Sequence, residues 1–421
     1  MKIKEEDATQ LLVDLIGIES PSRGEGPLAE FVAERLSAAG MKVYFDRHQN
    51  LYGEYTFGGE ANRDGAYLKG EPAEAEGRRP CRQREEGPIV LFNTHLDNVP
   101  PGGGWKTRPF EAAVEDGVLW GRGACDPKGA LTAMILAMEC VIEEGKKEAK
   151  DFEGKKDFQG KKGFRGKLLF MGAVTEEISP PSEKGTWKAV KDGLIQADMA
   201  ICGEPTENIP CIGEFGKVEY ELIVHGKPAH ASAPEKGVNA ILNMAELLTA
   251  LNQKVERRWS ELLGRRGTFN VGTIAGGVQV NIIPELARAS FERRLVPGQT
   301  AEESRRELLS ICEEVKARIP ELEYELVVTG EGNPAVISKD EPVAAMLSHS
   351  IQEVTGSRRE AGGFVAHADA DWLITYGGIP TVIYGPGALS DAHTSHEKVE
   401  LSQVREAAEV LAAFLERAFL D

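Results

Sequence analysis

The sequence predicts a two-domain α/β protein, with a central mixed, mostly parallel sheet flanked by helices and an inserted ferredoxin-like α+β domain. The chain of 421 residues exceeds what one ordinary hydrophobic core organises, so two domains are expected. Apolar strand runs and helical periodicity occupy both ends of the chain. The middle instead follows the order strand, helix, strand, strand, helix, strand. We therefore expect one domain over residues 1–212 and 333–421, and an inserted domain over residues 213–332.

The N-terminal segment is expected to form two amphipathic helices over residues 6–39, because apolar residues recur there at helical spacing. A Ser-, Pro- and Gly-containing stretch at 20–26 separates them, and Gly40 stands where a C-cap belongs. A strand at Lys42–Phe45 follows. Residues 58–88 are rich in Gly, Pro and charge without periodicity, so we interpret them as a solvated surface insertion.

The first candidate site residues follow an apolar strand run at Ile89–Phe92. His95 and Asp97 lie two residues apart and therefore project from one face of a strand, which suits a metal-ligating imidazole with a carboxylate beside it. Asp126 follows in a Gly-rich turn just before a helical run at Ala130–Ile142. Such a His-x-Asp is weak evidence alone, since a histidine at a strand end is more often a hydrogen-bonded structural residue.

Further carboxylates and a histidine raise the odds of a metal site, because each again follows an apolar run. The strand runs Lys167–Val174 and Ala197–Cys202 deliver acids at their C-terminal ends. In open α/β sheets these ends border one crevice, so a single shared site is expected. The additional candidates are Glu176, Glu177, Glu204 and His393.

Residues 145–167 repeat a six-residue unit that contains Phe152, Phe158 and Phe164 and is basic within an acidic protein. This period fits neither helix nor strand. An interaction arm is one interpretation of the segment, but a flexible, low-complexity loop is the favoured one.

The composition excludes several classes of protein. A formal charge of −18 argues against nucleic acid or anionic membrane as a partner. No 18-residue apolar run and no secretory leader is found, so a cytoplasmic protein is expected. The six cysteines form no C-x-x-C pair, so neither a disulfide framework nor a Cys-based zinc site is indicated. Cys125, next to Asp126, is interpreted as a small buried residue.

The inserted domain and the C-terminal part are assigned by their periodicity. In the insertion we expect strands at 217–224, 268–274, 278–295 and 321–328, with helices at 238–255 and 301–318. The second helix begins at Thr300 with capping-box spacing to Glu303. The chain then returns to the first domain with a helix at 343–355, a strand at 381–384 and a helix at 402–419.

Taken together, the motifs resemble those of a dinuclear zinc metallopeptidase family. This family includes acetylornithine deacetylase, succinyl-diaminopimelate desuccinylase, aminoacylase and glutamate carboxypeptidase, and the resemblance covers nearly the whole chain. The motifs that carry it are His95-Leu96-Asp97, the "GRGACDPKG" block, Glu176-Glu177, "GEPT" at 203–206, "HGKPAHASAP" at 225–234, "GGVQVNIIP" at 276–284, "ERRLVPG" at 292–298 and "AHTSHE" at 392–397.

The resemblance implies two divalent metal ions per chain in the first domain. One ion would be held by His95, Asp126 and Glu204, and the other by Glu177, Asp126 and His393, so that Asp126 bridges them. His396 is the only rival to His393, and the family spacing selects His393. A mixed set of imidazoles and carboxylates suits zinc first, with cobalt or manganese as alternatives.

The resemblance also implies the catalytic and lid residues. Glu176 would be the general base, and Asp97 would orient His95. The inserted domain would be a lid and a dimerisation domain of a homodimer, whose His230 reaches the other subunit's site and stabilises the oxyanion. The lid positions Asn281 and Arg294 match residues that bind a substrate carboxylate or carbonyl.

Two positions depart from the family pattern. Relatives often carry an Asp-x-Arg sequence where this chain has Asp369 and Asp371. Asp369 therefore matches the substrate-binding acid, but the missing arginine weakens a strict desuccinylase assignment. Pro127 follows the bridging Asp126, where relatives hold a cis bond at a non-proline residue. Proline lowers the cost of the cis form from about 3–4 to about 0.5–1 kcal/mol, so a cis Asp126–Pro127 bond is predicted.

The function that follows from this resemblance is metal-dependent hydrolysis of an amide, acting as a deacylase on N-acyl amino acids or small peptide-like amides. A dipeptidase, tripeptidase or carboxypeptidase of the same family is the alternative. A metal-free binding or scaffold homologue is the alternative from another class. A binding module has no need of the base Glu176, so its presence beside all five ligand candidates argues against a scaffold.

Overall fold

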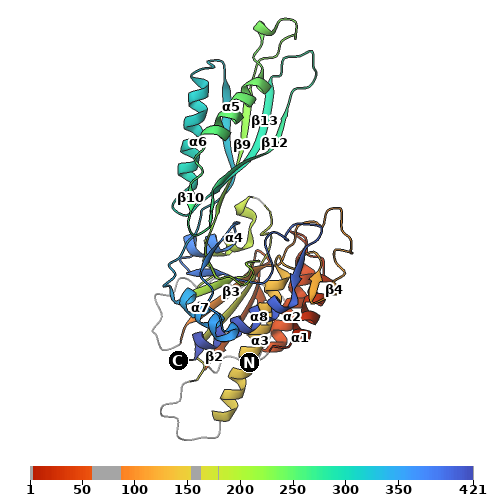
Figure 1. The fold of residues 1–421 in the computed structure, drawn as a ribbon, viewed down its shortest axis with the longest axis vertical. Coiled ribbons are helices and arrows are strands. Elements are labelled where there is room, and N and C mark those ends of the chain that lie inside the picture. The colour runs from red at the N-terminus through yellow and green to blue at the C-terminus, as the bar shows by residue number, and fades with distance from the viewer. Residues whose placement is uncertain (1–2, 59–86, 153–162, 179, 421) are drawn as a thin grey trace.

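The structure, a computed structural model, describes residues 3–58, 87–152, 163–178 and 180–420. The chain folds into two units that follow each other along the long axis of the molecule, as Figure 1 shows. The larger unit contains both ends of the chain. The smaller unit is built from the middle of the sequence and stands at the opposite end.

An eight-stranded mixed sheet forms the centre of the larger unit, in the order β1-β2-β6-β3-β7-β16-β8-β15. The pairs β6/β3, β3/β7, β7/β16 and β8/β15 are parallel, and the other pairs are antiparallel. This confirms the predicted fold class. The strands are β1 (Lys42–Phe45), β2 (Leu51–Phe57), β3 (Ile89–His95), β6 (Gly166–Ala173), β7 (Met199–Cys202), β8 (Cys211–Glu214), β15 (Gly362–Phe364) and β16 (Thr381–Ile383).

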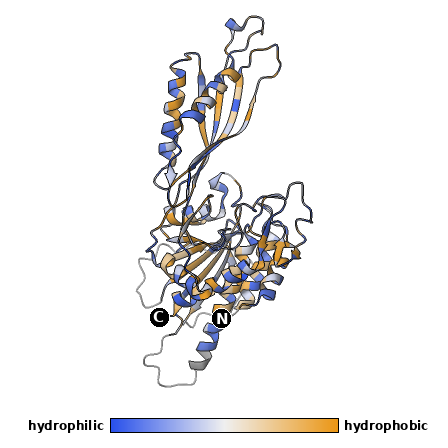
Figure 2. Ribbon diagram, viewed as in Figure 1, coloured by the Kyte–Doolittle hydropathy of each residue, from blue (hydrophilic) through white to orange (hydrophobic). Residues whose placement is uncertain are grey.

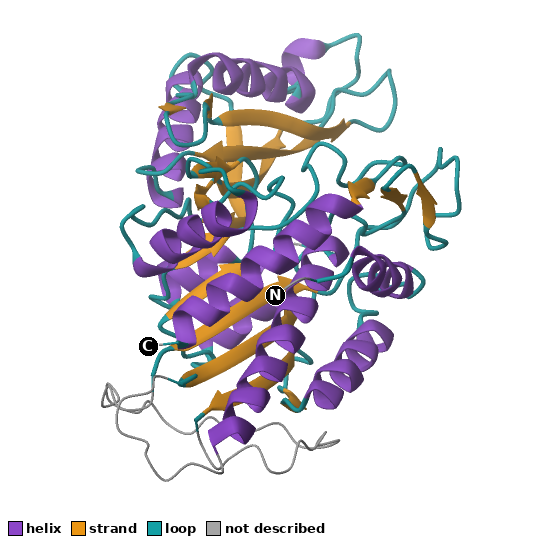
Figure 3. Cartoon of the chain, turned by 60° about the horizontal axis from the view of Figure 1, so that its bottom comes forward, coloured by secondary structure: helices purple, strands orange, loops and turns teal. Residues whose placement is uncertain are grey.

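Helices cover both faces of this sheet (Figure 3). Along β3, Val90 and Phe92 join the core beneath the long helices, whereas Leu91 faces the other way and packs with Ala189 of α4. Figure 2 shows the apolar strands at the centre and polar residues on the outer helix faces. The helices are α1 (Glu5–Ile16), α2 (Gly26–Ala39), α3 (Lys128–Phe152), α4 (Gly185–Lys191), α7 (Pro342–Thr355) and α8 (Leu401–Phe419).

The smaller unit is an antiparallel four-stranded sheet in the order β12-β13-β9-β14 with two helices on it. Its chain order is strand, helix, strand, strand, helix, strand, as predicted. The predicted capping box at the start of α6 is present: Thr300 accepts from the Glu303 backbone N–H, and Glu303 accepts in return. The elements are β9 (Gly216–His225), α5 (Ala240–Lys254), β12 (Thr268–Gly276), β13 (Leu286–Leu295), α6 (Ala301–Lys316) and β14 (Glu323–Gly332).

Two short sheets complete the described strands. One joins β17 (Lys398–Glu400), β5 (Val118–Trp120) and β4 (Ala113–Glu115), and the other joins β10 (Trp259–Ser260) and β11 (Arg265–Arg266). Among the described helices, none combines the length and apolar character needed to span a membrane.

Several predicted elements needed correction. A loop was predicted from Gly145, but helix α3 continues to Phe152. Residues 278–285, predicted as strand, lie outside any strand, and β13 begins only at Leu286. Most of the predicted surface insertion, at 59–86, and residues 153–162 of the repeat lie outside the described residues. The Asp126–Pro127 bond is cis, which confirms that prediction.

Candidate metal centre

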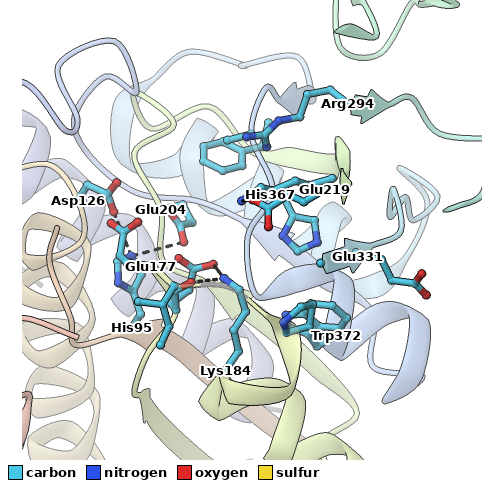
Figure 4. A pocket seen from close by; sticks show the side chains of 18 of the residues that line it. His95, Asp126, Glu177, Lys184, Glu204, Glu219, Arg294, Glu331, His367 and Trp372 are labelled. Atoms are coloured by element: carbon cyan, nitrogen blue, oxygen red, sulfur yellow. Dashed lines mark hydrogen bonds and ion pairs between the residues drawn. The ribbon is translucent and has the colours of Figure 1, made fainter. Parts of the chain in front are cut away.

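The candidate site residues lie at the carboxyl end of the central strands, as the crevice argument predicted. His95 is the last residue of β3, and the 175–177 turn follows β6. Glu204 lies two residues after β7. His393 comes from the loop between β16 and β17. Four segments far apart in the sequence therefore meet at one edge of the sheet. Figure 4 shows His95, Glu177 and Glu204 from three of them close to Asp126.

The first group of potential ligands is His95, Asp126 and Glu204, all of which are buried. His95 Nε2 lies 3.0 Å from Asp126 Oδ1 and 3.8 Å from Glu204 Oε1. One ligand atom of each residue lies within 4.8 Å of the others, which is close enough for a single cation to contact all three. The sequence predicted this set.

The second group is Asp126, Glu177 and His393. His393 Nε2 lies 2.8 Å from Glu177 Oε1 and 3.3 Å from Asp126 Oδ2. Asp126 thus offers Oδ1 to the first group and Oδ2 to the second. The donor set therefore fits a pair of cations that share one carboxylate.

The electrostatics of the two groups favour a cation. Burial, together with the charge of Asp126, raises the pKa of Glu204 and raises that of Glu177 to about 7. Burial also opposes the charged form of Asp126, but hydrogen bonds from His393 and His95 outweigh it and lower its pKa. Three carboxylates held this close repel one another, and divalent cations bound by them would relieve the repulsion.

Asp97 fixes the geometry of the site from behind. Its carboxylate accepts the backbone N–H groups of Glu176 and Glu177, both at 3.0 Å, and the hydroxyl of Ser22 at 2.6 Å. Asp97 Oδ1 also lies 3.4 Å from Nδ1 of His95. Asp97 is fully buried, so it connects a ligand candidate on β3 to the turn after β6.

The turn that carries Glu176 has an unusual backbone. Thr175 has φ 57, a left-handed conformation that a β-branched residue rarely adopts. Its N–H donates to Glu25 Oε1 at 2.9 Å, and its hydroxyl donates to the Glu183 carbonyl at 2.6 Å. These contacts hold the turn. The side chain of Glu176 lies beside Lys184, whereas that of its neighbour Glu177 lies beside His393.

Glu176 is paired with Lys184, a residue that sequence reasoning missed. Lys184 Nζ lies 2.5 Å from Glu176 Oε1 and also donates to the Glu176 carbonyl. Burial would raise the pKa of Glu176, but the Lys184 ammonium outweighs burial and holds that pKa below its usual range. The carboxylate is therefore available as a proton acceptor. The only signal in the sequence was a lysine seven residues after an acidic pair.

The predicted substrate-binding and lid residues lie in different places. Arg294 lines the same pocket as the candidate ligands. Asp369 is 2% exposed and accepts from the Thr186 hydroxyl at 2.6 Å, behind the pocket wall. His230 and Asn281 are exposed on the smaller unit, where the carbonyl of Asn281 accepts from the backbone of Ala231, and neither lines this pocket. Their proposed roles stay predictions.

Glu397 anchors the Asp126 turn. One of its oxygens accepts the N–H groups of Cys125 and Asp126, both at 3.2 Å, and the other pairs with Arg122. The side chain of Glu397 is 0% exposed and that of Arg122 is 2% exposed. This pair is therefore a buried support of the site.

We expect Glu397→Gln to lower the free energy of unfolding by about 3–5 kcal/mol, because it leaves the Arg122 charge buried without a charged partner. Urea denaturation of the metal-free protein measures this. The exposed pair Arg417–Glu353 provides the control, and Glu353→Gln should cost much less. Equal costs for the two variants would contradict the buried anchor.

Two family models match the chain. Residues 91–153 match "Peptidase family M20/M25/M40", and residues 212–320 match "Peptidase dimerisation domain". The second match covers most of the smaller unit, and the first contains most of β3 and the Asp126 turn.

Two curated relatives and one solved structure are also similar to this chain. Succinyl-diaminopimelate desuccinylase from Gluconacetobacter diazotrophicus is 28% identical over 80% of this chain and 83% of its own. The enzyme of the same name from Beijerinckia indica is 27% identical over 98% of this chain and 99% of its own. A tripeptidase structure from Staphylococcus aureus has a TM-score of 0.74 at 20% identity and covers 99% of both chains.

Proposed function

The chain belongs to the M20 family of metallopeptidases, and from this premise we propose that it hydrolyses the amide bond of an N-acyl amino acid or a small peptide-like substrate. The observation that carries the proposal is the position of Asp126, whose two carboxylate oxygens face two separate groups of ligand candidates. One shared carboxylate between two cation sites is the arrangement that co-catalytic hydrolysis needs.

Two divalent cations, zinc first with cobalt or manganese as alternatives, would polarise the amide carbonyl and lower the pKa of a shared water. His95, Asp126 and Glu204 would hold one ion, and Asp126, Glu177 and His393 the other. The chain's own contribution to proton transfer is Glu176. It would take a proton from the attacking water and deliver it to the nitrogen of the leaving amine.

Lys184 and Asp97 support this step. The ammonium of Lys184 keeps the carboxylate of Glu176 in its charged form, which is the form that accepts a proton. Asp97 fixes the backbone of residues 176 and 177 and the ring of His95. The base and two ligand candidates therefore share one support, which keeps their spacing constant during turnover.

The smaller unit, residues 213–332, would act as a lid and as the contact surface of a homodimer. Its exposed apolar residues support this, since Val278 and Val280 are 85% and 102% exposed near the His230 loop. In a dimer, His230 of one subunit would approach the other subunit's site and stabilise the oxyanion. Arg294 would bind a carboxylate or carbonyl of the substrate, since it already lines the pocket.

A peptidase remains the second candidate within the family. The tripeptidase from Staphylococcus aureus supports it through its fold alone, because its identity to this chain is 20%. The curated desuccinylases favour the deacylase. The scaffold alternative is disfavoured by Glu176, which lies in the pocket beside both ligand groups.

We expect the purified protein to take up two equivalents of zinc, cobalt or manganese per chain and to lose all amide hydrolysis on chelation. Metal analysis after dialysis and assays on N-acetyl, N-succinyl and dipeptide substrates measure this. Metal addition should also raise the melting temperature, because an ion that binds only the folded state stabilises it. Hydrolysis that survives complete metal removal would overturn the proposal, and a chain that takes up no metal would favour the scaffold.

A further inference from the structure

One row of the smaller sheet lines the same pocket as the ligand candidates. Gly332 of β14 pairs with Lys217 of β9, and Lys217 pairs in turn with Arg294 of β13, so the three residues lie side by side. All three line the pocket, and we refer to them as the pocket row. The position of this row therefore sets the space that a substrate has between the metal centre and the smaller unit.

The two segments that connect the units run next to each other. The N–H of Glu214 donates to the carbonyl of Ala335 at 2.9 Å, and Gly213 forms an antiparallel bridge with Val336. Gly332, at one end of the pocket row, lies three residues before Ala335. Contacts at this connection can therefore place the row relative to the larger unit.

Asp371 of the larger unit holds the end of β14. It is fully buried, and its Oδ2 accepts the N–H of Asn333, the residue after Gly332, at 3.0 Å. The side-chain amide of Asn333 donates to the Tyr376 hydroxyl at 3.2 Å. Its Oδ1 accepts the N–H of Ala301, the first residue of α6, at 3.3 Å. Asn333 therefore joins β14, α6 and the larger unit at one point.

The ring of His367 makes a second contact between Asp371 and β14. Its Nε2 lies 3.4 Å from Asp371 Oδ2. A Cβ at Gly332 would collide with this nitrogen, so the ring rests against a position that only glycine leaves open. The ring also packs edge to face on Trp372, with centroids 5.4 Å apart, and Figure 4 shows the two side chains together. With its side chain 5% exposed, His367 fills the space between the strand and the indole.

The loop that carries Asp371 and His367 is anchored in the larger unit. Glu214, the last residue of β8, is fully buried, and its Oε2 accepts the N–H of Ala368 at 2.6 Å. Asp371 directly precedes the π-helical turn Trp372–Tyr376, a conformation that is frequent at functional sites. The contacts of Asp371 therefore link β14 to a fixed part of the large sheet.

We propose that Asp371 is a positioning residue that holds the pocket row in place through Asn333 and His367. The inference rests on the proposed amide hydrolysis and concerns how its substrate is bound. Asp371 is not among the residues that line the pocket or form the two ligand groups, so it acts through its neighbours. Relatives of the resembled family often carry arginine here, whereas in this chain the position serves the connection between the units.

Asp371→Leu should raise KM at least about tenfold, because a displaced Arg294 loses a charge-assisted hydrogen bond to the substrate. We expect kcat to stay within about threefold, since Glu176 and the metal ligands keep their contacts in the larger unit. Asp371→Asn retains an acceptor for the Asn333 N–H and should restore the wild-type KM. Asp340→Leu, at an exposed position of the same unit, is the control for loss of charge.

Three results of these assays would overturn the proposal. The first is an unchanged KM in Asp371→Leu, and the second is an equal rise in Asp371→Asn. The third is a fall in kcat at constant KM.

Gly332→Ala tests the contact from the strand side. The added methyl group collides with His367, so KM should rise as it does in Asp371→Leu. Gly26→Ala is the control, because no atom lies within 4 Å of a Cβ there. Combined with His367→Ala, Gly332→Ala should cost nothing further, since the collision is then absent. Effects that simply add would show that the methyl group acts on the substrate directly, and would contradict the contact.

Hydrogen exchange gives a readout that does not depend on turnover. In Asp371→Leu the amides of residues 330–336 should exchange at least about tenfold faster, because their local opening costs less. Amides of β3 and β6 should keep their wild-type protection, which shows that the larger unit remains folded. Wild-type exchange at 330–336, or loss of bound metal from Asp371→Leu, would overturn the positioning role.

The two proposals fail differently. A metal-loaded wild type that hydrolyses no amide contradicts the amide hydrolase, but the exchange of residues 330–336 still tests whether Asp371 holds β14. Amide hydrolysis with wild-type KM and wild-type exchange in Asp371→Leu contradicts only the positioning role.

Discussion

Glu176→Gln is expected to lower kcat by about 10²–10⁴-fold while both metal ions stay bound. The glutamine keeps the size of the side chain but cannot take a proton from water or return one to the amine. The candidate ligands keep their positions, because the backbone N–H groups of residues 176 and 177 still donate to Asp97. Steady-state assays and metal analysis of the same preparation measure the two effects.

Glu183→Gln is the matched control for this variant. Glu183 lies next to Lys184 in sequence, and its half-exposed side chain pairs with Arg23 rather than with the site. We expect near-wild-type turnover from it. A Glu176→Gln protein with two metals and wild-type rates would remove Glu176 from its proposed role. Loss of metal together with activity would instead assign Glu176 a structural part in the site.

His230→Ala should lower kcat by about 10²–10³-fold, the usual cost of removing one donor to an oxyanion. The imidazole is exposed on the smaller unit, with Nδ1 2.7 Å from the Ser232 hydroxyl, and it lies outside the pocket of its own chain. Its Nε2 remains available to the site of a second subunit. Mixing His230→Ala chains with Glu176→Gln chains should therefore restore activity, because each mixed dimer contains one complete site.

His225→Ala serves as the control for this experiment, because His225 lies on the same unit and pairs with Glu325 away from the pocket. It should retain activity without mixing. The formation of mixed dimers is checked by mass spectrometry of differently tagged chains. Mixed dimers that remain as inactive as the two parents would show that the lid does not act across subunits.

The fold could be predicted in those segments of the chain where one pattern of apolar residues is clear. The helical spacing of apolar residues identified α1, α2, α7 and α8, and the change in the order of elements identified the ferredoxin-like unit. The extension of α3 to Phe152 was missed because a repeat of six residues hides the helical period. Strand β2 was missed for a related reason: both of its faces are largely buried, so alternation between polar and apolar residues is weak.

The candidate site likewise contains residues that could be predicted from the sequence and residues that could not. Ligand candidates could be found because each follows an apolar strand, and the sheet brings the strand ends together. Lys184 and His367 could not be found, since their importance lies in contacts with Glu176 and Asp371 rather than in spacing. The exchange at position 371 was visible in sequence, but its partner was not. That partner is His367, whose Nε2 lies 3.4 Å from Asp371 Oδ2.

The carboxylate of Asp97 receives two successive backbone amides and lies beside an imidazole, so three functional groups take their position from one point. A small movement of β3 against β6 would carry these groups together instead of separating them. Loss of the Asp97 carboxylate would have the opposite effect, because the groups that it holds would no longer keep their relative positions. A substitution at residue 97 is therefore expected to release a proton acceptor and candidates for both cations at once.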